Sequence, residues 1–335
     1  MNLFHEAERL HRRCLDKGLD EEDLDIVCRW PREHLAVLFA ASDQVRRSSF
    51  GASIEPCAIM NIKSGGCTED CAFCSQSSHN TAEVKTSPLR AAPEIVDAYR
   101  KAREHGLSFG VVSSGRGLSP RELDRLVEAL EACGGPSHAS LGILNENQFR
   151  RLRKAGVVCY NHNLETGRHF FPRIVGTHDY RQRIETVRRA KAAGMRVCSG
   201  GIFGLGESWE DRKELCLQLR DLDVDTIPLN FFNPVAGTRL PPPRESPWEL
   251  LKIVALFRLA HPRRHIKVCG GREFHLGRLQ PLMFLAGADG FISGNYLTTT
   301  GDSVDADEEL ARLMNLRKEG DIDRGPASRP AETSA

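Results

Sequence analysis

The sequence lacks a long apolar run, an excess of charge of one sign and an N-terminal signal-peptide pattern. Because a membrane-spanning helix needs about 20 apolar residues, we expect no membrane segment. The 46 basic and 45 acidic residues leave a formal charge of +1, which gives no reason to expect nucleic acid or an anionic membrane as a partner. Eleven cysteines without a secretory signal indicate metal binding in a reducing cytoplasm, not disulfides.

The chain also lacks a Gly-x-Gly-x-x-Gly turn with an acidic partner, which argues against a doubly wound open sheet. Apolar, β-branched segments instead alternate with charged helical patterns. The expected strands are 57–62, 109–112, 138–141, 157–163, 196–202, 226–231, 266–269 and 290–293. The expected helices are 92–105, 120–132, 146–154, 180–193, 209–222, 247–260, 277–285 and 306–316. Eight such units predict an α/β fold of the TIM type, a (β/α)8 barrel whose active site lies at the carboxyl ends of the strands.

We divide the chain into three parts on this basis. Residues 1–50 show helical spacing and are expected to form an N-terminal helical extension. Residues 51–317 are expected to form the barrel. Residues 318–335 are rich in Gly, Pro, Ser, Asp and Glu and are expected to be a disordered tail.

One loop carries the strongest chemical signal. Cys67, Cys71 and Cys74 form a C-x3-C-x2-C pattern that can hold three irons of a cubane cluster and leave the fourth iron open. Closed structural zinc sites need four ligands, and no His-x3-5-His follows, so zinc is the weaker alternative. Phe73, between the last two cysteines, is expected to shield the cluster and pack beside whatever binds the open iron.

Polar side chains follow several expected strands. Asn161 and Asn163 share one strand face, with Glu165 just beyond, which favours contact with a polar ligand over capping of the strand end. The glycine-rich segment 200–206 allows a ligand close approach, and Ile202 within it can lie against a purine. From spacing alone, Arg183 is expected to be an exposed helix arginine.

Other candidates lie at further strand ends. Asn230 falls near the end of one strand, and Lys267 and Cys269 share a face of another. Cys57 and Cys198 would also face the interior of a barrel. Taken one at a time, these cysteines are as well explained by core packing.

The C-x3-C-x2-C loop resembles that of the radical S-adenosylmethionine (SAM) enzymes. Further segments resemble the biotin synthase family: I-K-S-G-G-C-T-E-D-C-A-F-C, Y-N-H-N-L-E-T, V-C-S-G-G-I-F-G-L-G-E, I-P-L-N, G-G-R-E and F-L-A-G-A-D. The resemblance implies that SAM chelates the open iron of a [4Fe–4S] cluster and that one electron splits it to a 5′-deoxyadenosyl radical. It further implies insertion of sulfur between two carbons of dethiobiotin, the last step of biotin biosynthesis.

The resemblance also assigns roles to single residues. Cys67, Cys71 and Cys74 match the cluster ligands. Asn163 and Glu165 match residues near the SAM ribose, Arg183 one near the SAM carboxylate, and Ile202 one at the adenine. Asn161, Asn163 and Asn230 match positions that contact the dethiobiotin head.

The chain departs from the better-known family members at the auxiliary cluster that donates sulfur. Where those enzymes have three cysteines and an arginine, this chain has Gly110, His138, Cys198 and Lys267. Cys57 and Cys269 add two thiols, so the chain resembles the form with a more cysteine-rich auxiliary iron–sulfur cluster. We expect Cys57, Cys198 and Cys269 as its ligands. His138 is a possible fourth ligand, and a hydrogen-bonding histidine is an equal alternative.

The resemblance implies several partners: SAM, dethiobiotin, an electron donor such as flavodoxin or ferredoxin, the iron–sulfur assembly machinery, and a second copy in a homodimer. Two alternatives stay open at this point. One is a related radical SAM maturase or rearranging enzyme without sulfur transfer, and the other is a non-catalytic iron–sulfur or zinc protein.

Overall fold

The computed structural model describes residues 2–294 and 301–318. The expected tail, apart from Lys318, lies outside the described residues and stays a prediction. Within the described part of the chain, no helix is long and apolar enough to cross a membrane.

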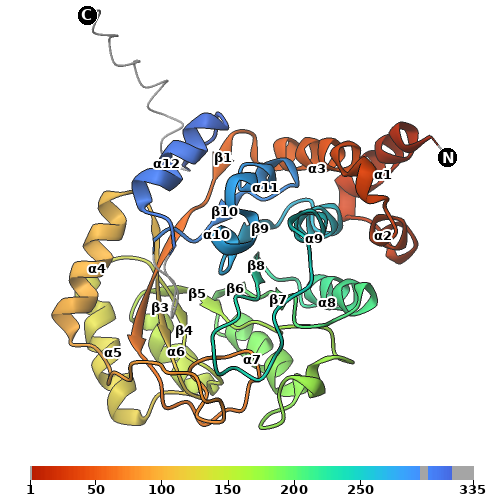
Figure 1. Ribbon diagram of the computed structural model, residues 1–335. Helices are drawn as coiled ribbons and strands as arrows, with labels where there is room; N and C mark the ends of the chain where they lie inside the picture. Colours follow the sequence, from red (N-terminus) through yellow and green to blue (C-terminus); the bar gives the residue numbers. More distant parts are fainter. Residues whose placement is uncertain (1, 295–300, 319–335) are drawn as a thin grey trace, which may run out of the picture.

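Parallel strands form the centre of the molecule (Figure 1). The strands are β1 (Ser53–Ile54), β2 (Cys57–Lys63), β3 (Ser108–Ser113), β4 (Ser137–Ser140), β5 (Val157–Asn161), β6 (Arg196–Cys198), β7 (Gly201–Phe203), β8 (Thr226–Phe231), β9 (His265–Val268), β10 (Gly290–Phe291) and β11 (Arg317–Lys318). The main sheet runs in the order β10-β9-β8-β6-β5-β4-β3-β2, with β7 also paired to β8. The short strands β1 and β11 form a separate parallel pair.

The two ends of the main sheet meet. Cys57 in β2 forms a parallel bridge with Ile292, just after β10. The amide of Ser293 donates to the carbonyl of Cys57 at 2.8 Å. The sheet therefore closes on itself, and the expected (β/α)8-type barrel is confirmed.

Helices cover the outside of the strands (Figure 1). They are α1 (Leu3–Lys17), α2 (Glu21–Cys28), α3 (Leu35–Phe50), α4 (Ala92–Glu104), α5 (Pro120–Cys133), α6 (Glu146–Lys154), α7 (Tyr180–Ala192), α8 (Trp209–Asp221), α9 (Pro247–Ala260), α10 (Arg272–Leu276), α11 (Leu282–Leu285) and α12 (Val304–Leu313). Single 3-10 turns lie at Arg32–His34, Phe171–Arg173 and Gly277–Leu279. Several helices begin with a capping box, such as Ser119 with Glu122 at α5, which supplies partners for amides that the first turn leaves free.

Each strand side chain faces either the helices or the barrel interior. Tyr160 of β5 points outward, and its ring meets Phe149 of α6 edge-on at 4.8 Å between centroids. Its hydroxyl donates to the carbonyl of Gly142 at 2.6 Å. The alternation of strand side chains then turns Asn161 toward the interior, where the site lies.

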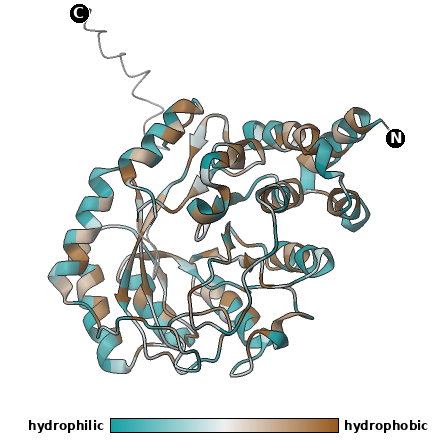
Figure 2. Ribbon diagram, in the orientation of Figure 1, coloured by the Kyte–Doolittle hydropathy of each residue, from teal (hydrophilic) through white to brown (hydrophobic). Residues whose placement is uncertain are grey.

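The N-terminal helices pack against α8 and α9 beside the barrel (Figure 1). Helix α9 is therefore enclosed, and Leu250–Ala260 are all buried. This explains why α9 is apolar along most of its length in Figure 2, whereas α4 and α5 alternate apolar and polar residues. The expected helices in residues 1–50 agree with α1 to α3, while the division into domains stays a prediction.

Several expected elements differ from the structure. The strand expected at 157–163 ends at Asn161, the strand expected at 290–293 ends at Phe291, and the helix expected at 306–316 spans Val304–Leu313. Asn163 therefore follows β5 and does not lie on it, although it lines the same cavity as Asn161. The strand expected at 196–202 is interrupted between β6 and β7, because Gly200 lies so close to β8 that an added Cβ would come within 1.9 Å of the Pro228 oxygen. The helix expected at 277–285 was wrong in part. A 3-10 turn occupies Gly277–Leu279, and α-helix is limited to Leu282–Leu285.

Candidate active site

A cavity of about 460 Å³ opens at the carboxyl ends of the strands. Every candidate site residue from the sequence lines it: Cys57, Cys67, Cys71, Phe73, Cys74, His138, Asn161, Asn163, Glu165, Arg183, Cys198, Ile202, Asn230, Lys267 and Cys269. These residues come from segments as far apart in sequence as β2 and the loop after β9. The fold thus brings together in one space the groups that the sequence analysis assigned to separate roles.

The cysteine loop between β2 and α4 is held in shape by its own hydrogen bonds. Ser78 donates its amide to the carbonyl of Cys67 at 2.8 Å. The side-chain amide of Asn80 donates to the carbonyls of Cys71 at 3.2 Å and Cys74 at 2.7 Å. Gly65 has a φ of +72°, and an added Cβ would lie 2.5 Å from Thr86, so the turn into the loop needs glycine. These bonds fix the loop backbone from which the three thiols project.

The three loop cysteines could hold an iron–sulfur cluster. Burial raises the pKa of the Cys71 thiol to about 12 and also raises that of Cys74. Without metal, these thiols therefore stay protonated, and binding of iron has to release their protons. Phe73 is half buried, lines the same cavity and packs against the core.

Glu165 is held in an unusual backbone conformation. Its φ is +73°, in the left-handed region that residues other than glycine rarely adopt. The amide of Ile202 donates to its carbonyl at 2.7 Å, and an added Cβ on Gly201 would lie 2.6 Å from the same oxygen. Close packing against the β7 segment therefore holds this backbone, as strained residues at functional sites require.

Arg183 is not the exposed arginine that spacing alone suggested. Its side chain is buried and lies 3.2 Å from Glu165. It also donates to the carbonyl of Asn163 at 2.7 Å. Burial raises the pKa of Glu165, and Arg183 opposes that rise.

The asparagines already hold parts of the structure. Asn163 accepts from the amide of Gly200 at 3.2 Å. Asn230 donates to the carbonyl of Gly201 at 3.1 Å and accepts from the amide of Gly270 at 3.1 Å. Asn161 donates to the sulfur of Cys198 at 3.2 Å. An amide has two N–H donors and two acceptor positions, so each keeps capacity for a neutral polar ligand.

A second group of thiols comes from the strands of the barrel. Cys57 begins β2, Cys198 ends β6 and Cys269 follows β9. Burial raises the pKa of all three, and Cys57 and Cys198 raise that of Cys269 further, because nearby thiols disfavour a second negative charge. Three strands thus bring buried thiols close enough to influence one another.

Charged groups accompany these thiols. Lys267 is buried, and its ammonium lies 3.2 Å from the carboxylate of Glu55. Burial and, next, the charge of Lys267 lower the pKa of His138 to about 4, so this ring is neutral and able to offer a lone pair. Glu55 was not among the sequence candidates, because nothing in the spacing marks it as the partner of a lysine so distant in the chain.

Sequence reasoning also missed Cys159. It lies on β5, is buried and lines the cavity. Burial raises its pKa, and Cys198 is the next largest influence. Cys159 stands two residues before Asn161 in β5, so the alternation that turns Asn161 inward also turns Cys159 inward, and the sequence contained this signal.

The residues present fit SAM and iron–sulfur clusters. The three loop thiols and the thiols of Cys57, Cys198 and Cys269 all line the cavity. One carboxylate oxygen of Glu165, Oε2, is buried without a hydrogen bond, which suits a hydroxyl donor from a ligand. The fit is to clusters and not to a single ion: among the described residues, no group of three His, Cys, Asp or Glu side chains is arranged to hold a single metal ion.

Solved structures share this fold. Methylornithine synthase (PylB) superposes with a TM-score of 0.81 at 20% identity, over 94% of this chain and 99% of that chain. HydG, a maturase of the [FeFe]-hydrogenase, has a TM-score of 0.77 at 16% identity, over 96% of this chain and 78% of its own. At such identities the likeness concerns the fold.

Two family profiles match the sequence. Residues 61–219 match the Radical SAM superfamily, and residues 228–317 match the Biotin and Thiamin Synthesis associated domain. The barrel, the three-cysteine loop and these matches define a radical SAM enzyme.

Curated relatives narrow the class. Biotin synthase of Geobacter sulfurreducens is 49% identical over 94% of this chain and 98% of its own length. The biotin synthases of Pelobacter propionicus (47%, covering 84% and 88%) and Syntrophus aciditrophicus (42%, covering 92% and 98%) are also similar. The chain belongs to the biotin synthase family, which uses a [4Fe–4S] cluster, SAM and an auxiliary cluster to insert sulfur into dethiobiotin.

Proposed function

We propose that the single cavity holds every reacting part, with the roles divided by depth. Cys67, Cys71 and Cys74 hold the [4Fe–4S] cluster at the mouth. Cys57, Cys198 and Cys269 hold the auxiliary cluster in the interior. The observation that supports this division is that both sets of thiols line one cavity, one set beyond the carboxyl end of β2 and the other including its first residue. A strand of this length extends about 20 Å, which leaves room for two ligands between the sets.

SAM binds the residues around Glu165, the position with the left-handed backbone. Arg183 meets its carboxylate, Glu165 and Asn163 its ribose, and Ile202 its adenine. The buried Glu165 Oε2 supports the ribose assignment, because a diol would supply the hydrogen bond that this oxygen lacks. Phe73 packs beside SAM and keeps water from the reacting atoms.

Dethiobiotin is placed by neutral amides. Asn161, Asn163 and Asn230 each keep free donor and acceptor positions, which match a ureido ring better than charged groups would. When bound, the two clusters and SAM supply the electron, the radical and the sulfur, and the protein holds the carbon and the sulfur source in register. His138 is neutral and lines the same cavity as Cys57, Cys198 and Cys269, so it is our candidate for a fourth ligand of the auxiliary cluster.

The test compares two triple variants of the reconstituted enzyme, purified without oxygen. Wild type should bind more iron than one [4Fe–4S] cluster accounts for. The variant with Cys57→Ala, Cys198→Ala and Cys269→Ala should lose that excess, still form 5′-deoxyadenosine, and make no biotin.

The matched control changes three cysteines outside the cavity: Cys14→Ala, Cys28→Ala and Cys133→Ala. It should keep the iron content and the biotin yield of wild type. Biotin formation by the first triple variant, or full activity of wild type with only one [4Fe–4S] cluster, would show that the sulfur comes from elsewhere.

The cellular setting follows from the same chemistry. We place the enzyme in the cytoplasm, with the assembly machinery that builds its clusters and a flavodoxin or ferredoxin as the electron donor. We also propose a homodimer. Light scattering of the reconstituted enzyme checks the dimer, and a monomer at micromolar concentration would exclude it.

A further inference from the structure

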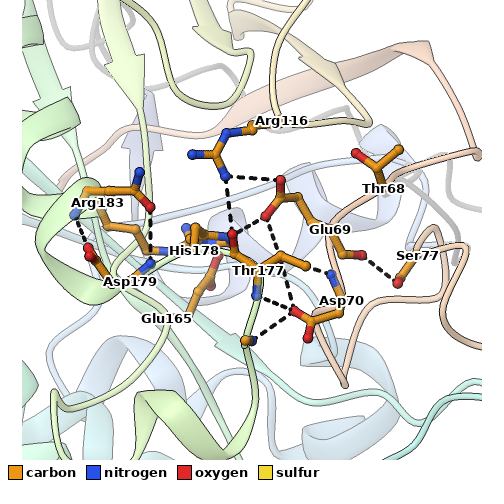
Figure 3. Close-up of polar contacts among 12 residues, drawn as sticks. Thr68, Glu69, Asp70, Ser77, Arg116, Glu165, Thr177, His178, Asp179 and Arg183 are labelled. Carbon is orange, nitrogen blue, oxygen red and sulfur yellow. Dashed lines mark hydrogen bonds and ion pairs between the residues drawn. The ribbon is translucent and has the colours of Figure 1, made fainter.

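The cysteine loop is fastened to the segment that precedes α7. Asp70 accepts the amides of Gly176 at 2.8 Å and Thr177 at 3.0 Å. Glu69 accepts from the hydroxyl of Thr177 at 2.6 Å and also contacts the ring of His178. Figure 3 shows these contacts, which join residues more than 100 positions apart in the sequence. Glu69 and Asp70 lie directly between Cys67 and Cys71, so the fastening is made within the cysteine motif itself.

His178 continues this connection toward the SAM side of the cavity. Arg183 Nε donates to His178 Nε2 at 3.1 Å. Because a guanidinium can only donate, Nε2 carries a lone pair, and the ring proton is on Nδ1, where it is donated to Glu69. Arg183 in turn meets Glu165 at 3.2 Å and the carbonyl of Asn163 at 2.7 Å.

The series Glu69, His178, Arg183, Glu165 is buried, with the histidine ring between the Glu69 carboxylate and the Arg183 guanidinium. Each of the four residues is at most 9% exposed. Burial raises the pKa of Glu69, but the bonds from Thr177 and His178 outweigh it and leave the pKa below its usual value. Burial and Arg183 lower the pKa of His178, which keeps the ring neutral between the carboxylate and the guanidinium.

This arrangement fixes a long side chain at a defined place. A free arginine samples many rotamers, and holding it costs conformational entropy at the moment of ligand binding. Here the Nε edge of Arg183 is bound to His178, and its NH1 is bound to Asn163 and Glu165. The guanidinium is therefore oriented by the cysteine loop as well as by its own helix.

We propose that Glu69 and His178 are positioning residues, through which the cysteine loop orients Arg183 for SAM. The inference rests on the proposed function, in which Arg183 meets the SAM carboxylate and the loop cysteines hold the cluster. The loop presents Glu69 to His178, and His178 in turn holds the guanidinium of Arg183 in one orientation.

Two substitutions of His178 separate its two bonds. The amide nitrogen of asparagine lies near Nδ1, so His178→Asn keeps donation to Glu69 and loses the acceptor for Arg183. The amide oxygen of glutamine lies near Nε2, so His178→Gln keeps the acceptor for Arg183. A bond to a charged group of this kind accounts for roughly a 10- to 100-fold change in a binding constant.

We expect His178→Asn to raise the Kd and KM for SAM by about 10-fold or more, with kcat reduced far less. His178→Gln should stay within about 3-fold of wild type. Both variants should keep the iron content of wild type. The electron paramagnetic resonance signal of the reduced cluster should shift on addition of SAM at lower SAM concentration in His178→Gln than in His178→Asn.

His169→Asn is the matched control. This histidine lies in the same chain segment between β5 and α7, but its ring is exposed and bonded to Glu214. It should bind SAM as wild type does. Glu69→Gln provides a second route. It should weaken SAM binding several-fold, and combining it with His178→Asn should add little, because both changes break one connected series.

The outcomes separate failure of the SAM assignment of Arg183 from failure of the positioning role of His178. If Arg183→Gln leaves SAM affinity unchanged, the proposed SAM assignment fails and this inference fails with it. If Arg183→Gln weakens SAM but His178→Asn does not, the assignment stands and the positioning role is wrong. Equal losses in His178→Asn and His178→Gln, or full additivity with Glu69→Gln, would also overturn it, since a general packing effect predicts both.

Discussion

Removing the charge of Glu55 should destabilise the apoprotein by about 3 kcal/mol. Glu55 lies 3.2 Å from Lys267, whose side chain is 5% exposed. Burial raises the pKa of Glu55, but Lys267 and His265 outweigh this and bring it from 4.5 to about 2. A difference of about 2.5 pKa units corresponds to about 3.4 kcal/mol. Because the lowered value belongs to the folded state, this stabilisation is fully present above pH 4.5 and is lost as the pH falls through 2.

The assay is urea unfolding of the apoprotein at pH 7, with Glu55→Gln compared with wild type. Breaking a buried ion pair by removing one partner typically costs about 3–5 kcal/mol, which agrees with the value from the pKa. Glu128→Gln is the matched control, because Glu128 is exposed on α5. Its unfolding free energy should stay within about 0.5 kcal/mol of wild type.

A double variant tests the cause. Lys267→Met removes the second charge and fills a similar volume, so Glu55→Gln combined with Lys267→Met should recover most of the lost stability. A cost below about 1 kcal/mol for Glu55→Gln, or a double variant as unstable as Glu55→Gln alone, would contradict this role of the ion pair. In either case the pair would not be compensating a buried charge.

Two further predictions concern stability at other places in the fold. Burial lowers the pKa of His261 to about 3, so the folded state keeps it neutral while the unfolded chain binds a proton below pH 6.5. This difference in proton binding lowers the unfolding free energy of the apoprotein by about 1.4 kcal/mol between pH 7.5 and 5.5. His261→Asn should reduce the pH dependence of urea unfolding by that amount. The control His5→Asn, at an exposed histidine, should not change it. Gly200→Ala would place a Cβ 1.9 Å from the Pro228 oxygen, so thermal unfolding should show that the protein loses about 1–3 kcal/mol of stability. In the control Gly117→Ala, the nearest contact of the new Cβ is 3.6 Å, so its stability should be nearly that of wild type.

The strand and helix order could be predicted because local signals mark it. Apolar β-branched segments and capping residues lie at nearly every boundary, as at α6 (Glu146–Lys154) and α9 (Pro247–Ala260), whose ends agree with the expected ones. The interruption between β6 and β7 could not be predicted in this way. It depends on how closely Gly200 approaches Pro228 on the neighbouring strand, which local sequence does not encode.

The residues of the site likewise fall into those that local sequence predicts and those that it does not. The three-cysteine spacing and the strand alternation mark residues that face the cavity, and alternation extended by one step would also have included Cys159. The contacts of Glu69 with His178 and of Glu55 with Lys267 carry no such mark. Each joins residues more than 100 positions apart, and each depends on side-chain geometry that only the closed barrel defines.

The left-handed backbone at Glu165 restricts how this position can change over evolutionary time. Among residues with a Cβ, asparagine and aspartate adopt that region most readily, and glycine does so without cost. Glycine and asparagine would remove the carboxylate that faces Arg183. Aspartate alone keeps both the negative charge and the tolerance for positive φ. We therefore expect Glu165→Asp to be tolerated better than other substitutions here, and a variant library built for new substrates should hold this position to glutamate and aspartate.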